Sequence, residues 1–252
     1  MAREEPRSVI LTVLIEGTSM SISPPRTMIG VFAEMSVQAM PLSAEPMPQP
    51  PTAPGYYKLA FSGCGVTNGF WGVIYAVGLK DQCKVIRHYV EAFLKAGNTV
   101  AINFVGQSRG GIAGVYLAHE LACFQKAQVV LNLLLFDPVP GDPIWFSRYL
   151  DFGSVLNSNW AMDVSQVGNI GNVLLLYPYE PLPAIALHSP IIPDFPESCK
   201  LEKDVILGMH QGALFVTRQP ETCLAFWRIR KFLMQNGTRL DRSPFRGNLD
   251  VE

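Results

Sequence analysis

The strongest constraint on the fold comes from residues 99–111, where an apolar run leads straight into a serine between two glycines. Residues 99–105 are mostly apolar and include β-branched side chains, as in a strand buried on both faces. Residues 106–110 read Gly-Gln-Ser-Arg-Gly, and residues 112–124 have the apolar spacing and the Ala and Leu content of a helix. A strand, a tight Gly-x-Ser-x-Gly turn and a helix in this order predict a parallel sheet with helical connections.

The same alternation of strand-like and helix-like patterns extends along most of the chain. Further strands are predicted at 8–15, 56–61, 129–136 and 172–177, and further helices at 79–96 and 222–234. Alternating strands and helices favour an α/β fold, in which helices cover both faces of a mostly parallel central sheet. Ligands of such folds bind at the carboxyl ends of the strands, so candidate residues are sought there.

The chain has 252 residues, of which 48% are hydrophobic and 16% are charged. This composition can bury one large core, so we expect a single domain over residues 1–252. Residues 41–54 hold six prolines, whose backbone nitrogens carry no hydrogen. That segment is expected to be an exposed loop that joins neither a strand ladder nor a helix.

Charge and apolar run length disfavour several classes of protein. The net charge of -1 gives no electrostatic reason to hold nucleic acid. No apolar stretch reaches the roughly 18 to 20 residues needed to span a bilayer, and the N-terminal segment lacks the form of a secretory signal. We expect a chain that is cytoplasmic as synthesised, and export by a signal-independent secretion system stays open.

The five cysteines are odd in number and form no Cys-x-x-Cys pair, which argues against a disulfide framework and a zinc site. They are Cys64, Cys83, Cys123, Cys199 and Cys223. We interpret them as reduced thiols, and we expect neither a metal nor a cofactor.

Ser108 is the first candidate for a chemical role. In a strand-to-helix turn its hydroxyl projects at the edge of the sheet, while the flanking glycines let neighbouring backbone pass closely. The start of the following helix offers N–H groups to the negative charge that develops on an acyl oxygen, that of Arg109 among them. We predict that Ser108 is a nucleophile; the alternative is a serine that only caps a helix.

A serine nucleophile needs a base, and the chain has four histidines. His88 lies in a predicted helix, and His119 lies in the helix after the turn, roughly 16 Å from its start. Neither is expected to reach Ser108. His188 follows an apolar stretch, and His210 lies between glycines in an expected loop. Position favours His210 and leaves His188 open.

The base in turn needs an acid to orient it, and Asp137 ends the strand predicted at 129–136. The carboxyl end of that strand lies at the same edge of the sheet as the serine turn. The alternative for Asp137 is to cap the turn that follows. The remaining candidates are Asp142, Asp163 and Asp194.

Several motifs together resemble the α/β-hydrolase domain of type VI secretion phospholipase effectors and of their uncharacterised bacterial and fungal relatives. The resemblance covers about residues 8–215. Its motifs are Gly63-x-Gly65 after a strand, Gly-x-Ser-Arg-Gly at 106–110, Phe136-Asp137-Pro138-Val139, Gly208-Met209-His210 and, in place of the family's Asp-Gly-Thr, Glu16-Gly17-Thr18. Gln107 stands where the family commonly has phenylalanine.

The resemblance implies a serine hydrolase with an α/β-hydrolase fold. The implied nucleophile, base and orienting acid are Ser108, His210 and Asp137. The implied oxyanion donors are the backbone N–H groups of Arg109 and of Gly17 or Thr18.

We therefore predict a phospholipase-like serine esterase or lipase that cleaves carboxylic esters, of lipid or phospholipid acyl groups, through an acyl-enzyme. Apolar loop residues are candidates to line an acyl pocket or to touch a membrane surface: Phe70, Trp71, Pro143, Ile144, Trp145, Phe146 and residues 191–195. Two alternatives stay open. One is a soluble small-ester hydrolase with no lipid role, and the other is an inactive hydrolase scaffold that binds partners.

Overall fold

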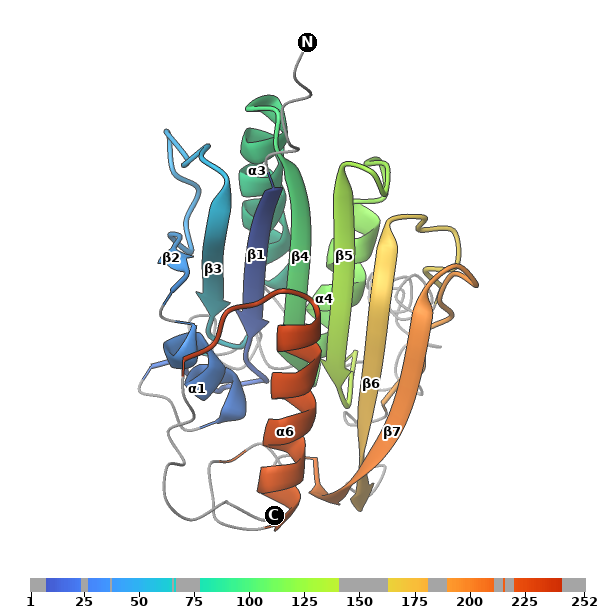
Figure 1. The fold of residues 1–252 in the computed structure, drawn as a ribbon. Helices are drawn as coiled ribbons and strands as arrows, with labels where there is room; N and C mark the ends of the chain where they lie inside the picture. The colour runs from blue at the N-terminus through green and yellow to red at the C-terminus, as the bar shows by residue number, and fades with distance from the viewer. Residues whose placement is uncertain are drawn as a thin grey trace, which may run out of the picture.

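The computed structural model describes residues 8–23, 27–36, 38–64, 66, 78–140, 163–180, 190–210, 215 and 220–241. The described residues form one seven-stranded sheet in the order β2-β3-β1-β4-β5-β6-β7, and every neighbouring pair of strands is parallel. The carboxyl ends of the strands therefore share one edge of the sheet, at the bottom in Figure 1.

The strands include all those that the sequence predicts. They are β1 (Ser8–Ile15), β2 (Met40–Pro41), β3 (Gly55–Phe61), β4 (Thr99–Gln107), β5 (Val129–Phe136), β6 (Ile170–Glu180) and β7 (Lys200–Met209). The predictions at 8–15 and 129–136 are confirmed residue for residue, and β6 extends beyond the predicted 172–177 at both ends. β4 lies at the middle of the sheet, so the turn that follows it is central on the carboxyl edge.

Helices cover both faces of the sheet (Figure 1). Helices α3 (Leu79–Lys95) and α4 (Arg109–Glu120) pack on one face, and α1 (Met28–Met35) and α6 (Pro220–Gln235) pack on the other. The predicted α/β class is thereby confirmed. No helix within the described segments is long and apolar enough to cross a membrane.

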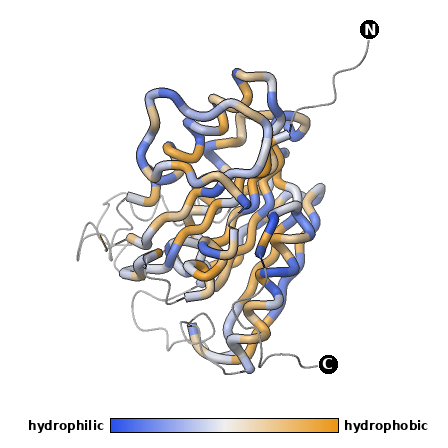
Figure 2. Tube along the Cα trace, turned by 60° about the vertical axis from the view of Figure 1, so that its left-hand side comes forward, coloured by the Kyte–Doolittle hydropathy of each residue, from blue (hydrophilic) through white to orange (hydrophobic). Residues whose placement is uncertain are grey.

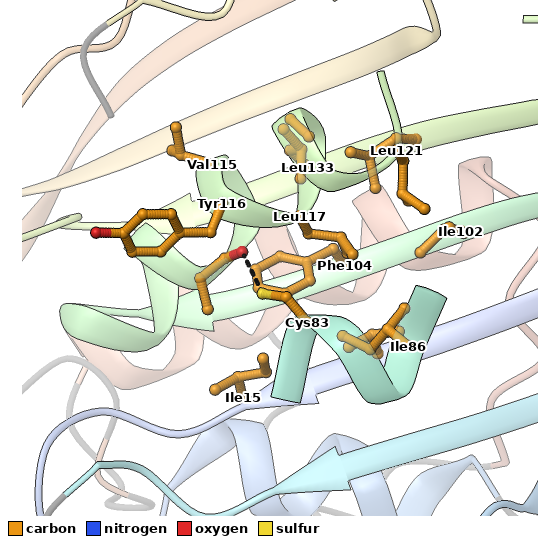
Figure 3. Close-up of a cluster of buried hydrophobic side chains, with 14 of the residues drawn as sticks. Ile15, Cys83, Ile86, Ile102, Phe104, Val115, Tyr116, Leu117, Leu121 and Leu133 are labelled. Carbon is orange, nitrogen blue, oxygen red and sulfur yellow. Dashed lines mark hydrogen bonds between the residues drawn. The ribbon is translucent and has the colours of Figure 1, made fainter. Parts of the chain in front are cut away.

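Each pair of helices buries an apolar layer against the sheet, and Figure 2 shows hydrophobic colouring along the strands. Figure 3 shows the layer beneath α3 and α4, where Phe104 of β4 packs against Leu117 of α4. In the same layer the Sγ of Cys83 donates to the carbonyl of Ala113 at 3.3 Å and so links the two helices. This apolar packing fixes the direction in which α4 runs from the turn at Ser108.

A ladder of buried polar side chains crosses the opposite face of the sheet. Asn103 Nδ2 donates to Thr238 Oγ1 (2.8 Å), and Asn103 Oδ1 accepts from Asn132 Nδ2 (2.9 Å). Asn132 Oδ1 accepts the backbone N–H of Asn172 (3.0 Å), and the hydroxyls of Thr12 and Thr238 lie 3.0 Å apart. These bonds join β1, β4, β5 and β6 to the turn after α6 and fix the register of the strands.

Three elements were not predicted. The sequence pattern did not reveal α1, which is short and apolar on most sides, or β7, whose first half is charged. Pro41 was assigned to the proline-rich loop at 41–54, but it belongs to β2 and pairs with Lys58 of β3. That strand lies at the edge of the sheet, where a missing N–H is tolerated. Residues 42–54 lie in no helix or strand and are largely exposed.

Candidate active site

Ser108 lies at the sharp turn between β4 and α4, at the centre of the carboxyl edge. Its backbone has φ 54° and ψ -120°, a conformation that residues other than glycine rarely adopt. Its N–H donates to the carbonyl of Phe136 at the end of β5 (2.8 Å). The strained turn is thus pinned to the neighbouring strand.

The glycines on either side of Ser108 are required by close backbone contacts. A Cβ on Gly106 would lie 2.3 Å from the carbonyl oxygen of Gly110. A Cβ on Gly110 would lie 2.6 Å from the carbonyl oxygens of Ile15 and Glu16, at the end of β1. Because these distances are far shorter than van der Waals contact, only glycine allows α4 to begin so close to β1 and β4.

Asp137 directly follows β5 and also has a positive φ, 43°. Its N–H donates to the carbonyl of Leu176 in β6 (2.8 Å), so this turn too is held by the next strand. The side chain is buried, and its Oδ2 accepts a hydrogen bond from Nδ1 of His210. A carboxylate on Nδ1 fixes the ring tautomer in which Nε2 is the basic nitrogen.

His210 is the first residue after β7, at the same edge of the sheet. The sequence prediction of a loop around His210 is therefore wrong for residues 207–209, which belong to the strand. The His210 side chain is 4% exposed, and its backbone carbonyl accepts a hydrogen bond from the Gln107 Nε2 (3.1 Å). Both the ring and the backbone of His210 are thus held by residues from other strands.

A small pocket brings the predicted residues together. It has a volume of about 20 Å³, comparable to one water molecule, and is lined by Gly17, Thr18, Met20, Gln107, Ser108, Arg109 and His210. Five of the six predicted site residues line it, and the sixth, Asp137, contacts His210 from outside. The arrangement has the parts needed for nucleophilic catalysis, and the catalytic roles themselves stay predictions.

The loop after β1 forms the other wall of the pocket. The Arg109 Nη1 donates to Thr18 Oγ1 (2.9 Å), and the N–H of Ser19 donates to the carbonyl of Cys64 (2.9 Å). A Cβ on Gly63 would lie 1.7 Å from the carbonyl oxygen of Gly17. The loops after β1 and β3 therefore touch backbone to backbone, which holds Gly17 and Thr18 beside Ser108.

Glu16 is a buried carboxyl group next to this loop. Its Oε1 accepts a hydrogen bond from the Thr27 hydroxyl, and its Oε2 has no hydrogen-bond partner. Burial raises the pKa of Glu16 from 4.5 to about 7, although the Thr27 hydroxyl and the backbone N–H groups of Gly30 and Gly17 partly oppose that effect. Glu16 therefore changes its charge near neutral pH, within one residue of a predicted oxyanion donor.

The other histidines and aspartates are placed less favourably or lie outside the described residues. The His88 Nε2 contacts the carbonyl of Met47 on the proline-rich loop, and His119 lies in the last turn of α4. Asp163 and Asp194 are exposed and share an isolated bridge. His188 and Asp142 lie outside the described residues.

The candidate acyl-pocket residues are only partly described. Phe70, Trp71 and residues 143–146 lie outside the described part of the chain. Ile191 is buried, its N–H donating to the carbonyl of Pro138 (2.9 Å), and Ile192 is 52% exposed. All five cysteines are free thiols, and the described segments contain no cluster of His, Cys, Asp and Glu that could hold a metal ion.

Two residues of the site were not predicted to have a role there. Gln107 and Glu16 were noted only as departures from the family pattern, yet Gln107 bonds to His210 and Glu16 lies against the loop after β1. The contact of Gln107 joins segments 103 residues apart, whereas Glu16 directly precedes Gly17 in the sequence. The available signal was that the family which the sequence resembles commonly has phenylalanine in place of Gln107 and aspartate in place of Glu16.

Comparison of the sequence with known proteins gave no match to any family model and none to the curated proteins. Comparison of the structure gave several matches. An uncharacterized protein from Pseudomonas aeruginosa has a TM-score of 0.55 at 9% identity over 95% of this chain and 48% of its own. Est1E from Butyrivibrio proteoclasticus, with ferulic acid bound, has a TM-score of 0.51 at 14% identity over 92% and 90% of the two chains.

A third match is the Tle1 effector bound to the VgrG spike of the type 6 secretion system, with a TM-score of 0.49 at 13% identity over 87% of this chain and 53% of that one. This chain thus spans about half the length of the Pseudomonas protein and of Tle1. At such identities, structural similarity speaks for the fold alone. The sheet order and the likeness to Est1E show that the chain has an α/β-hydrolase fold.

Proposed function

We propose that the protein is a serine hydrolase that cleaves carboxylic esters through an acyl-enzyme on Ser108. One observation carries the proposal. The buried pair of Asp137 and His210 meets the strained turn of Ser108 at a single pocket on the carboxyl edge of the sheet. A paired imidazole beside a serine in a strand-to-helix turn is the arrangement that activates a hydroxyl.

The proposed reaction has two halves. The His210 Nε2 takes the proton of the Ser108 hydroxyl as the oxygen attacks the ester carbonyl, and Asp137 stabilises the resulting imidazolium. The negatively charged oxygen is held by the N–H groups of Arg109 and of Gly17 or Thr18. When the intermediate collapses, His210 returns the proton to the leaving alcohol; water, deprotonated by the same ring, then releases the acid and restores Ser108.

We further propose lipid or phospholipid acyl esters as the substrates. This choice is supported by the likeness of the sequence to phospholipase effectors at Gly-x-Ser-Arg-Gly and Asp-x-Val. It is also supported by the edge strand β7, on which the apolar side chains of Val205, Leu207 and Met209 are each about half exposed and lead to His210. An apolar strip of this kind beside a site suits a substrate with long alkyl chains.

A fluorophosphonate probe tests the nucleophile. We expect the wild type to be labelled at Ser108, and we expect Ser108→Ala to remove labelling and to lower turnover of a nitrophenyl ester by at least about 10³-fold. His210→Ala should lower both. If Ser108→Ala is still labelled, the nucleophile is wrong; if His210→Ala keeps full turnover, the base is wrong and His188 becomes the candidate.

A second comparison tests the substrate. A lipase should hydrolyse dispersed phospholipid much faster once the substrate exceeds its critical concentration, whereas a soluble esterase should prefer short-chain nitrophenyl esters at all concentrations. A preference for the short esters would contradict the lipid proposal and favour the soluble alternative. A wild type that neither reacts with the probe nor turns over any ester would favour a binding scaffold.

A further inference from the structure

The position of His210 poses a problem of distance. Neighbouring strands lie about 4.8 Å apart, so β4 and β7, which are separated by β5 and β6, end roughly 14 Å apart. Ser108 is the first residue after β4 and His210 the first after β7, yet both line one pocket. Because His210 directly follows Met209, the carboxyl end of β7 itself must bend towards β4 (Figure 1), and something must hold it there.

Two contacts hold His210 in that position. Asp137, at the end of β5, accepts from the ring Nδ1 and so orients the imidazole. Gln107, the last residue of β4, donates from Nε2 to the backbone carbonyl of His210 (3.1 Å). The first contact is part of the proposed reaction. The second acts on the backbone that carries the base, and it comes from the residue next to the nucleophile.

The Gln107 side chain is buried between the base and the loop after β1. It is 3% exposed, and its Oε1, which has no hydrogen-bond partner, lies 3.0 Å from where a Cβ of Gly17 would be. Turning the amide over would set the oxygen against the His210 carbonyl, so that two acceptors would face each other. The side chain is therefore held in one orientation, with its donor toward His210.

We propose that Gln107 is a positioning residue for the general base: its amide fixes the backbone of His210 over the ends of β5 and β6, so that the imidazole stays within reach of Ser108. This inference rests on the proposed function. It gives a role to a polar side chain of the turn that the reaction does not itself use.

Gln107→Met tests the proposal because methionine matches the size of glutamine and cannot donate to the carbonyl. We expect kcat for a nitrophenyl ester to fall about 10- to 100-fold, as for a base displaced by up to about 1 Å, with KM changed less than about twofold. The rate of fluorophosphonate labelling should fall by a similar factor. Gln107→Asn, which keeps the amide on a shorter side chain, should show the same loss if the methionine variant does not fold.

Asn98→Leu is the matched control, since Asn98 lies just before β4, about 30 Å from its other end. Its Nδ2 also donates to a backbone carbonyl, that of Thr52 (2.8 Å), and its Oδ1 is likewise buried without a partner. Removing this amide should lower the melting temperature yet leave kcat and the labelling rate within about twofold of wild type. If Gln107→Met behaves in the same way, Gln107 is only structural and the proposal is overturned.

Proton NMR separates this proposal from the proposed function. The Nδ1–H of His210 in its bond to Asp137 should give a low-field signal, which its loss in His210→Gln would assign. We expect Gln107→Met to shift or broaden that signal, and Asn98→Leu to leave it unchanged. If the wild type proves inactive toward esters, the signal still decides: an unaltered resonance in Gln107→Met overturns the positioning role, and an altered one supports it without any catalysis.

Discussion

Glu16 shows how a single residue makes the molecule sensitive to pH. The pKa of its carboxyl group is 4.5 in an unfolded chain and about 7 in the fold, because burial disfavours the charged form. Between these values the folded state binds a proton that the unfolded state has released. The contribution to stability is therefore full below pH 4.5 and is lost as pH rises through 7.

Replacing Glu16 with glutamine should remove this pH dependence. Glu16→Gln is uncharged at every pH, so we expect its free energy of unfolding to exceed that of wild type by about 3 kcal/mol at pH 8 and to approach the wild-type value near pH 5. Urea unfolding at both pH values is the measurement, with the exposed Glu45→Gln as control. A variant no more stable than wild type at pH 8 would show that Glu16 is not buried as a neutral acid.

The predictions made for single residues depended on how local their signals were. Ser108 and Asp137 could be identified because each directly follows a clear apolar strand and is flanked by glycine or proline. His210 was less certain, since nothing near it in the sequence says that the chain returns toward Ser108. The bond from Gln107 to His210 spans 103 residues, and no local pattern encodes it.

At the scale of whole elements, the contact between the loops after β1 and β3 is the feature that shapes the pocket. Gly63 allows it, because any side chain there would meet the carbonyl of Gly17. The sequence shows glycines after β3, but no local pattern predicts that they contact the loop after β1. That contact follows from β1 and β3 being parallel neighbours.

Gly63→Ala should therefore displace Gly17 and Thr18 while leaving the sheet intact. We expect the rate of fluorophosphonate labelling to fall about 10- to 100-fold, because an oxyanion donor moves out of place. Gly168→Ala is the matched control, since a Cβ there meets nothing within 4 Å. Equal labelling rates in the two variants would mean that the loop after β1 does not contribute to the reaction.

Two of the unpredicted elements, β7 and α1, share a physical cause. β7 lies at the edge of the sheet with one face exposed, and the charges in Lys200 to Asp204 hide the alternation that marks a strand. α1 has only eight residues and few polar side chains, so its pattern is too short to separate from a buried strand. In both cases tertiary packing, rather than local propensity, decides the structure.

For the whole molecule, the ladder of buried polar side chains ties the sheet to the turn after α6. Thr238 bonds to Thr12 and to Asn103, and the ladder continues from Asn103 through Asn132 to the backbone N–H of Asn172. Its members come from both halves of the chain, so the sheet and α6 should unfold together. These polar residues can be read from the sequence, but the hydrogen bonds between them depend on strand order, which no local pattern specifies.

Asn132→Leu tests this coupling. The change leaves Asn103 Oδ1 and the N–H of Asn172 without their partners, so we expect the free energy of unfolding to fall by about 3 kcal/mol. Urea unfolding, monitored by circular dichroism, should still show one transition. The dependence of the free energy of unfolding on urea concentration should be unchanged. A second transition in the variant would mean that part of the sheet unfolds independently of α6.

The positive φ angles of Ser108 and Asp137 have one more consequence. At each position a residue other than glycine adopts a backbone conformation that it disfavours. A hydrogen bond from its N–H to the neighbouring strand holds that conformation. Glycine would adopt the backbone conformation of Ser108 at little steric cost, so we expect Ser108→Gly to exceed the wild type by about 1 kcal/mol in the free energy of unfolding. Asp137→Gly should lose stability instead, because the buried Nδ1 of His210 would then lose its carboxylate acceptor. A Ser108→Gly variant more stable than the wild type would show that the serine at this turn lowers stability rather than adding to it.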